Sequence, residues 1–218
     1  MFKKAGEGRS EGDERKSVYE RVLGADFAEL HPGLRSYFGA IPEGLEGVGS
    51  GRYREAGLRL RVLRPLFAVL GRRQIAFAER GTDVPFTVSN VMAADGVLRA
   101  TRRFRFATAT RQMTDAMRVV DGRLVDRIGR SGEVEVDLAI RVEGGGLRME
   151  SRRLALRIRG LRIPIPRVIG LTLRETVDDD GVQHIEVRVR APLVGEVYGY
   201  VGAFRYALRP VGRAAAER

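Results

Sequence analysis

Alternation of apolar and polar residues with a period of two dominates the chain after residue 82. The clearest case is EVEVDLAIRV (133–142), in which every second residue is Val, Leu or Ile. The same period runs through the segments 84–92, 97–107, 168–177, 184–191 and 196–208. Because successive side chains of a strand point to opposite faces, this pattern predicts half-buried β-strands.

Turn signals separate these strands at short intervals. They stand at Asp121-Gly122, at Gly144–Gly146 and at Asp178–Gly181. Roughly nine strands joined by such turns indicate antiparallel pairing, and no long helix is available for parallel crossovers. The predicted fold is mainly β, a strongly curved antiparallel sheet or partly closed β-barrel with short N-terminal helices.

A single β-rich domain is predicted over residues 17–210. Helical spacing covers 17–39, with Pro32 at the first turn of a short helix. The glycine-rich segment 41–51 is interpreted as a loop, and the alternating LRLRV (58–62) as a short strand before an apolar helix that opens at Pro65. Residues 1–16 lack an apolar run and predict a disordered leader, and residues 211–218 predict a frayed tail.

The stretch GLRIPIPRVIGL (160–171) places two prolines inside an apolar run. Proline cannot donate to a sheet ladder, so Pro164 and Pro166 exclude a central strand here. The apolar residues predict an extended segment across the open end of the curved sheet, where they would plug or line the interior. The alternative is an ordinary edge connection packed on the outside.

Composition narrows the chemistry. The chain has no cysteine and two histidines, so disulfides, thiolate nucleophiles and a zinc site of three imidazoles are excluded, and no metal site is predicted. No cofactor motif is found. The net charge of +11 fits either a polyanionic partner or a genome that encodes basic residues as arginine. A cytoplasmic location is predicted, because no signal peptide or apolar run of membrane length is seen.

Two charged residues occupy apolar faces of predicted strands. Arg102 shares a face with Leu98, Ala100 and Phe104, and Glu175 shares one with Leu173 and its neighbours. A buried guanidinium is tolerable only when it is paired, so Arg102 and Glu175 suggest each other as partners. They could form a polar floor that holds a ligand, or a structural ion pair.

Aromatic residues line one face of the last predicted strand. Tyr198, Tyr200 and Tyr206 are candidate ligand contacts, and they form either a cavity wall or an aromatic core whose hydroxyls reach the surface. Phe104, on the predicted strand 97–107, is a further candidate contact. His31 stands before Pro32 between two short helices and is a further candidate, as a ligand contact or as a helix cap.

Four segments, taken in order, resemble an uncharacterised bacterial family known only as a domain of unknown function. They are VLGADFAELHPGLRSYFG, RRFRF, IPIP and APLVGEVYGYVGAF, which together span about residues 18–208. The residues that carry the resemblance are His31, Pro32, Arg102, Phe104, Pro164, Pro166, Glu175, Pro192, Gly195, Tyr200 and Gly202. Some members are fused behind an NAD(P)-binding saccharopine-dehydrogenase-like reductase domain, so the resemblance implies a reductase partner but carries over no catalytic residues.

Three classes of function remain open. The preferred hypothesis is a ligand-binding domain that holds an apolar or amphiphilic small molecule in the concave face of the sheet. The second is an enzyme that uses Glu175 or His31 as an acid or base on such a ligand. The third is an interaction module for a reductase or an anionic membrane. Because the arginines are spread along the chain, only weak, salt-sensitive binding to anionic membrane or nucleic acid is expected. The oligomeric state is not predicted.

Overall fold

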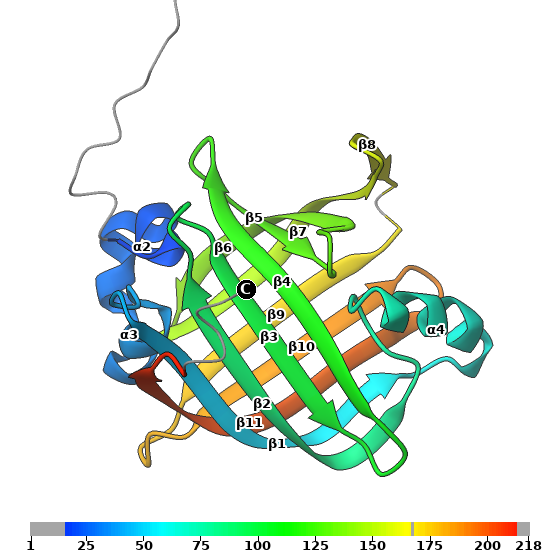
Figure 1. Ribbon diagram of the computed structural model, residues 1–218, viewed down its shortest axis with the longest axis horizontal. Helices are drawn as coiled ribbons and strands as arrows, with labels where there is room; N and C mark the ends of the chain where they lie inside the picture. Colours follow the sequence, from blue (N-terminus) through cyan, green and yellow to red (C-terminus); the bar gives the residue numbers. More distant parts are fainter. Residues whose placement is uncertain (1–15, 167, 213–218) are drawn as a thin grey trace, which may run out of the picture.

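Antiparallel strands make up most of the computed structural model, which describes residues 16–166 and 168–212 (Figure 1). Two short helices and a 3-10 helix come first: α2 (Val18–Leu23), η1 (Gly24–Glu29) and α3 (Pro32–Phe38). The strand β1 (Leu45–Leu58) is followed by η2 (Arg61–Leu63) and α4 (Arg64–Arg72). The remaining strands are β2 (Arg80–Met92), β3 (Leu98–Arg105), β4 (Thr110–Val120), β5 (Arg123–Ile128), β6 (Val134–Glu143), β7 (Gly146–Ile158), β8 (Leu161–Ile165), β9 (Gly170–Val177), β10 (Gln183–Ala191) and β11 (Gly195–Pro210).

The strands close into a barrel. Neighbours follow the order β6-β5-β4-β3-β2-β1-β11-β10-β9-β7, and a further pairing of β6 with β7 completes the ring. Every pairing is antiparallel, and β8 is attached only to β7. The mainly β prediction is therefore confirmed, and the sheet is closed. Closure leaves no free edge within the ring of ten strands.

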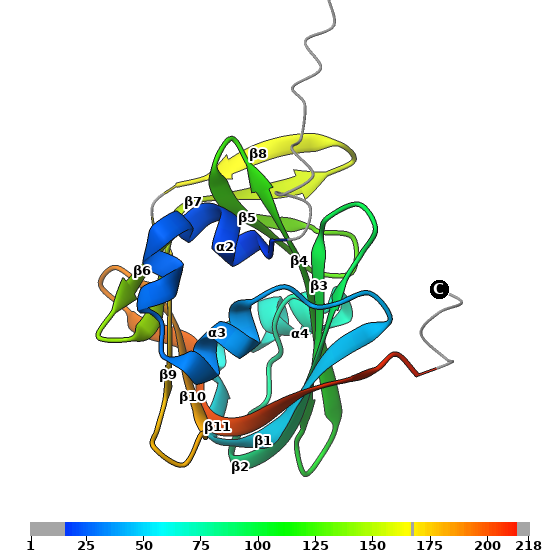
Figure 2. The ribbon, with the colours of Figure 1, turned by 90° about the vertical axis from the view of Figure 1, so that its left-hand side faces the viewer.

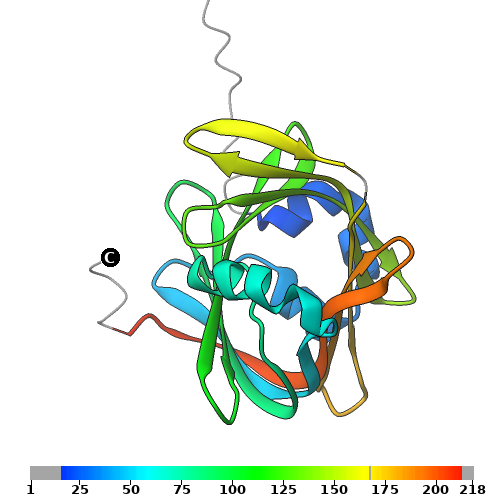
Figure 3. The ribbon, with the colours of Figure 1, turned by 90° about the vertical axis from the view of Figure 1, so that its right-hand side faces the viewer.

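Helices cover the two ends of the barrel. Figure 2 shows α2 and α3 across one end, and Figure 3 shows α4 across the other. The first helix is fixed by a capping box, in which the Ser17 hydroxyl accepts from the Glu20 backbone and the Glu20 carboxylate accepts from the Ser17 backbone. In the described parts of the chain, no helix combines the length and the apolar character needed to cross a membrane.

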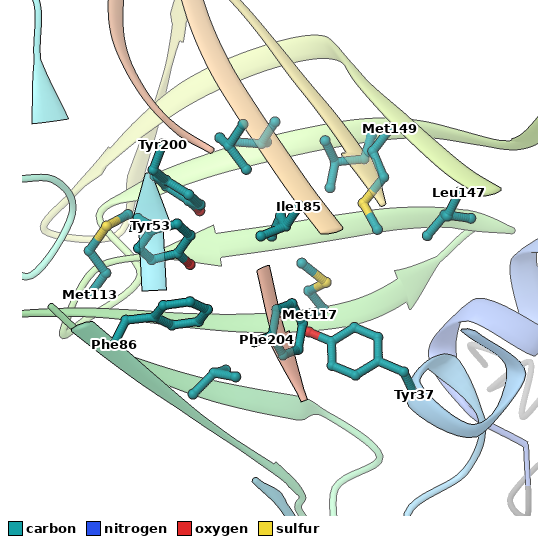
Figure 4. Packing of buried hydrophobic residues seen from close by; sticks show 14 of the residues in the cluster. Tyr37, Tyr53, Phe86, Met113, Met117, Leu147, Met149, Ile185, Tyr200 and Phe204 are labelled. Carbon is teal, nitrogen blue, oxygen red and sulfur yellow. The ribbon is translucent and has the colours of Figure 1, made fainter. Parts of the chain in front are cut away.

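Aromatic rings fill much of the interior (Figure 4). The Tyr53 ring stacks on Phe86 with 3.8 Å between centroids, and it also contacts Phe104 and Tyr200. Sulfur-containing and branched side chains from β4, β7 and β10 complete this core. The alternating residues seen in the sequence are thus the inward-facing positions of a closed wall.

The segment 41–51 was predicted to be a loop, and this was wrong from Leu45 onward because β1 begins there. Its glycines make room for rings of the neighbouring strand. A Cβ on Gly47 would lie 1.6 Å from the Tyr206 hydroxyl, and one on Gly49 would lie 2.9 Å from a Phe204 ring carbon. The predicted strand at 58–62 was also wrong, because β1 ends at Leu58 and η2 follows.

The segment with two prolines forms the edge strand β8. Pro164 lies opposite Ala155 in the pairing with β7, and the other edge of β8 carries no partner in the described chain. The exclusion of a central strand is confirmed. The prediction that this segment plugs or lines the interior was wrong for Leu161 and Ile163, because their side chains are exposed and lie outside the ring.

The predicted tight turns are present. Asp121 and Gly122 have φ angles of 49° and 71°, as a two-residue hairpin turn with two positive φ angles requires. Gly144 and Gly145 adopt positive φ angles between β6 and β7. The predicted leader and tail lie outside the described residues, apart from residues 16, 211 and 212.

Candidate ligand pocket and polar interior

The strand β7 changes partner midway along its length. It pairs with β9 from Leu147 to Glu150, and with β8 from Leu154 to Ile158. Between these stretches the β6–β7 register slips, which leaves Arg152 as the extra residue of a β-bulge. A bulge bends its strand, so β7 turns away from β9 at this point. The barrel wall is therefore divided here, with β7 and β8 on one side and β9 and β10 on the other. We call this division the split.

A single side chain marks the start of the split. The Ser151 hydroxyl accepts a hydrogen bond of 2.9 Å from the Leu171 backbone. Beyond it, in the described chain, β7 and β9 form no further ladder pairs. Figure 1 shows the β7–β8 hairpin projecting from this end of the barrel.

A pocket of about 900 Å³ lies in the split. Its size falls within the range of about 300 to 1,000 Å³ that is usual for small-molecule sites. Ser151 and Leu154 line it from positions opposite Leu138 and Val136, which are core residues. The lining comprises Ser151, Arg152, Arg153, Leu154, Ile165, Ile169, Gly170, Arg190, Ala191, Pro192, Leu193 and Gly195.

Three arginines on this pocket lack acidic partners. The side chains of Arg152, Arg153 and Arg190 are exposed, and none forms an ion pair or hydrogen bond with a described residue. By contrast, Arg157 and Arg162 on the same hairpin both bind Glu135, at 3.2 Å and 2.7 Å. Unpaired guanidinium groups beside apolar side chains are suited to a carboxylate or phosphate that carries a hydrocarbon part.

A second polar feature lies inside the barrel, around Arg102. Its guanidinium forms an ion pair with Asp115 on the adjacent strand β4. Burial opposes the charge on Arg102, but the Asp115 carboxylate and the tyrosines Tyr200, Tyr37 and Tyr53 together outweigh burial, so the pKa of Arg102 is raised. Of the Arg102 side chain, 15% is exposed, compared with 4% of Asp115.

Asp126 on β5 is the third member of this interior group. One of its carboxyl oxygens is buried without a hydrogen-bond partner in the described chain. Burial, reinforced by the nearby Asp115 carboxylate, raises the pKa of Asp126 well above its usual range. A raised pKa favours the neutral form of Asp126 beside the Arg102–Asp115 pair.

Glu175 is buried on β9, and the structure gives it a different partner from the predicted one. Gln183 on β10 donates a side-chain hydrogen bond to the Glu175 carboxylate. Burial raises the pKa of Glu175 to about 7, against the opposing effects of Gln183 and Arg102. Both predicted charges therefore face the interior, but the suggested Arg102–Glu175 ion pair is wrong because Asp115 is the ionic partner of Arg102.

The aromatic candidates are mostly packed against one another. Phe104 is fully buried against Tyr53, Phe77 and Tyr200. The Tyr198 hydroxyl donates to the Met113 sulfur at 3.4 Å. Burial raises the pKa of Tyr200 to about 12. These contacts place all three residues in the core.

Tyr206 differs from the other aromatic candidates because it is only partly buried. Its side chain packs against Tyr37, with 4.7 Å between ring centroids. Burial raises the pKa of Tyr206 to about 12, and the nearby Asn90 opposes this rise. Its hydroxyl oxygen is buried and forms no hydrogen bond of normal geometry with a described residue.

His31 is not part of either polar feature. It is the N-cap of α3, where its Nδ1 accepts from the Gly33 backbone at 3.2 Å, and it is exposed. Its own backbone amide donates to the Gly145 carbonyl oxygen at 2.9 Å. Residues 16–166 and 168–212 contain no group of three or more His, Asp or Glu side chains placed to hold a metal ion.

Sequence reasoning missed the acidic partners and the pocket. Asp115 shares the phase of Met113 and Met117, so its inward position could have been found by trusting that alternation. Asp126 stands two residues from Leu124 and Ile128, which gives the same signal. The bulge at Arg152 has no signal, because ESRRLALRI reads as one continuous strand.

Three comparisons place these features among known proteins. A sequence model of the family described as "Domain of unknown function (DUF4166)" matches residues 30–204. The "Uncharacterized protein YndH" of Bacillus subtilis (strain 168) is 27% identical over 199 residues, which cover 87% of this chain and 96% of that protein. The dehydratase domain of RzxB from Pseudomonas fluorescens matches over 79% of this chain and 80% of its own, at 10% identity. Its TM-score is 0.16, so that likeness carries no inference.

Proposed function

Because this chain belongs to the DUF4166 family, whose description names no activity, we propose from its own pocket that it binds an amphiphilic small molecule with an anionic head group. The family match confirms the resemblance to an uncharacterised bacterial family; the fusion to a reductase domain stays a prediction. One observation carries the proposal: a pocket of about 900 Å³ in a divided barrel wall, lined by apolar side chains and unpaired arginines.

The two kinds of lining residue have separate roles in this proposal. Arg152, Arg153 and Arg190 bind the carboxylate or phosphate of the head group by charge-assisted hydrogen bonds. Leu154 and Ile165 contact the hydrocarbon part, and removal of that part from water favours binding by about 25 cal/mol per Å² of apolar surface.

We propose that the ligand binds at the split and not among the interior aromatic residues. Phe104 and Tyr198 already fill the core with ring contacts, which leaves them no free surface for a ligand. Ser151 and Leu154 belong to the inward-facing rows of the wall. A hydrocarbon chain that enters at Leu154 therefore points along the inner face of the sheet.

Native mass spectrometry of the purified protein, followed by displacement of a fluorescent fatty acid, tests the proposal. Oleate and an alkyl phosphate should displace the probe more strongly than the corresponding alcohol, and their ranking identifies the head group. Gly170→Phe should abolish probe binding, because Gly170 lines the pocket, its φ is ordinary and an added Cβ meets no atom within 4 Å.

The matched control is Gly212→Phe. Gly212 also has open space around an added Cβ, but it lies outside the pocket, so this variant should bind the probe normally. Equal binding by the wild type and Gly170→Phe, or equal displacement by the acid and the alcohol, would exclude the proposed site.

A second candidate function is general acid or base catalysis by Glu175, which does not line the pocket in the split, on a small molecule that enters the barrel interior. The pKa of about 7, raised by burial, is the observation that favours it, because a carboxyl group of this kind exchanges protons near neutral pH. Incubation of the wild type and Glu175→Gln with the displacing ligands, followed by mass spectrometry, tests this function. Product formed only by the wild type supports an enzyme, and recovery of unchanged ligand from both supports a binding protein.

A further inference from the structure

Exposed apolar side chains gather at the end of the barrel that α4 covers. On the β7–β8 hairpin, Leu156 faces Ile163 and Ile158 faces Leu161, and all four are at least one third exposed. In the turn between β10 and β11, Leu193 is fully exposed and Val194 is 54% exposed. Apolar side chains that form such a group, and are not scattered singly, indicate an interaction surface.

The consecutive helices η2 and α4 contribute a third group of exposed apolar residues. Val62, Leu66 and Val69 are separated by four and three residues, so they lie on one side of the helical segment, and each is more than half exposed. Phe67 faces the opposite way and is buried against Tyr198. The helix is therefore anchored by one side and presents the other to solvent.

These three groups surround one mouth of the barrel. The hairpin and the β10–β11 turn share the walls of the pocket, through Ile165 and Leu193. The start of β11, directly after the turn, is joined to the segment before α4 by the ion pair of Arg59 with Glu196, at 2.9 Å. Figure 3 shows the β7–β8 hairpin, α4 and the β10–β11 turn around the same end.

Arginines without acidic partners stand among these apolar residues. Arg152, Arg153 and Arg190 line the pocket in the split, and Arg61 lines a smaller pocket of about 420 Å³ beside α4. None of the four forms an ion pair with a described residue. This mouth, which we call the α4 rim, therefore combines apolar groups with positive charge that the protein does not neutralise.

We propose that the α4 rim docks on an anionic lipid bilayer. Leu66, Leu161 and Leu193 enter the boundary between head groups and acyl chains, and the unpaired arginines bind lipid phosphates. A nucleic acid would match the charge but would leave the apolar side chains in water. The docking stands on exposure and charge alone and does not require the proposed ligand.

Salt dependence separates this docking from a purely electrostatic attraction. If the arginines were dispersed over the surface, binding to the bilayer would disappear at physiological salt. Because they are clustered beside apolar side chains that insert, binding should weaken but persist at about 0.15 M salt, since apolar burial is not screened by salt. Each arginine near an anionic surface should contribute about fivefold to the partition coefficient.

Co-sedimentation with vesicles of phosphatidylcholine, with and without phosphatidylserine, tests the proposal across a salt series. The wild type should bind the vesicles that contain phosphatidylserine at about 0.15 M salt and bind the neutral vesicles much less. Leu66→Ser combined with Leu193→Ser should lower the partition coefficient by at least about tenfold. Arg152→Gln and Arg190→Gln should each lower it by about fivefold.

Matched controls come from the opposite end of the barrel. Arg35 on α3 and Leu208 near the end of β11 are both exposed there, so Arg35→Gln and Leu208→Ser should bind vesicles as the wild type does. Gly170→Phe, which fills the pocket, should also still bind vesicles, so this proposal and the ligand proposal can fail separately. All variants should keep the circular dichroism of the wild type, since each changed side chain is exposed or faces open space.

Three results would overturn the docking proposal. One is absence of vesicle binding by the wild type at about 0.15 M salt. Another is equal loss of binding in the α4-rim variants and the opposite-end controls. The third is a dimer in sedimentation equilibrium that Leu66→Ser with Leu193→Ser dissociates, because the rim would then be an interface between two copies of the chain.

Discussion

Arg102 is a cation inside a barrel wall, and Asp115 on the adjacent strand makes its burial tolerable. A charge in this position loses its hydration and must recover the loss from a partner. Burial favours the neutral form of Asp126, which adds no second negative charge beside the pair. The two charges of the pair thus balance each other, and removal of Arg102 or Asp115 alone leaves an uncompensated charge.

Removal of the Arg102 side chain should be costly. We expect Arg102→Ala to lower the free energy of unfolding by about 3 to 5 kcal/mol, because it leaves the buried Asp115 carboxylate unpaired. Urea denaturation measures this loss. The double variant Arg102→Met with Asp115→Leu should recover most of it, because both charges then leave together.

Arg103 provides the matched control for this substitution. It is the next residue along β3 and is exposed, so Arg103→Ala should change stability by no more than about 0.5 kcal/mol. A loss below about 1 kcal/mol in Arg102→Ala would mean that the Arg102–Asp115 pair is screened by solvent.

Glu175 should make stability depend on pH. Its pKa in the folded protein, about 7, lies above the ordinary value of 4.5. Its stabilising contribution is therefore complete below about pH 4.5 and is lost as pH rises toward 7. Relative to Glu175→Gln, the wild type should lose about 2 to 3 kcal/mol of unfolding free energy across this window.

Denaturation curves of both proteins, recorded from about pH 4 to about pH 8 so that they cover this window, measure the difference. Glu175→Gln retains an oxygen that accepts from Gln183, so its fold should be unchanged. Parallel pH profiles for the two proteins would show that Glu175 titrates as an exposed carboxyl group does.

Hairpin turns fix the register of consecutive strands. Asp121-Gly122 connects β4 to β5 through two residues with positive φ angles. At Gly122 and Gly170 an added Cβ meets no atom within 4 Å, but only Gly122 has φ in the left-handed region, at +71°. The two glycines therefore separate backbone strain from steric contact.

Gly122→Ala should destabilise the protein by about 1 kcal/mol, because an L side chain is unfavourable at positive φ. Gly170→Ala should be neutral or slightly stabilising, since alanine reduces the freedom of the unfolded chain at no cost in the folded one. Thermal unfolding of both variants measures the contrast. Equal destabilisation would show that φ is not the reason for glycine at residue 122.

Local patterns allowed these elements to be predicted to very different extents. The turn at Asp121-Gly122 was predictable because its signal lies within the turn. The glycines of β1 were misread because their cause is remote: Gly47 and Gly49 lie under the Tyr206 and Phe204 rings, which come from the other end of the chain. Likewise, the bend of β7 depends on a bulge at Arg152 that the sequence does not mark.

The inner face of the barrel could be predicted as a set of residues but not as a set of contacts. The apolar–polar alternation along each strand predicted that Arg102, Glu175 and the tyrosines point inward, and the structure agrees. That alternation does not indicate which strands face each other around a closed ring. Arg102 was therefore paired with Glu175, while Asp115, on the adjacent strand, was not considered as its partner.

At the scale of the whole molecule, β11 and β8 should contribute very differently to folding. β11 joins β1 to β10, and its deletion (Gly195–Pro210) opens the ring and removes Tyr198, Tyr200 and Phe204 from the core. We expect the shortened chain to show no cooperative unfolding transition. Replacement of Arg157–Arg162 by Asn-Gly shortens only the β7–β8 hairpin, so cooperative unfolding should remain.

Near-ultraviolet circular dichroism and urea denaturation measure both outcomes. The shortened hairpin loses two arginine partners of Glu135, so its midpoint should fall although its transition stays sharp. A cooperative transition in the chain without β11 would show that the remaining strands form a stable open sheet.

Closure of the ring by the last strand also bears on synthesis of the protein. Leu45 pairs with Pro210, so β1 must wait for its second neighbour until the residues up to Pro210 have left the ribosome. Until then β1 and β10 are open edges, and the aromatic inner face is accessible to other nascent chains. The same pairing that seals the mature barrel therefore leaves the unfinished chain with two open strand edges and exposed apolar surface, features that favour aggregation and chaperone binding.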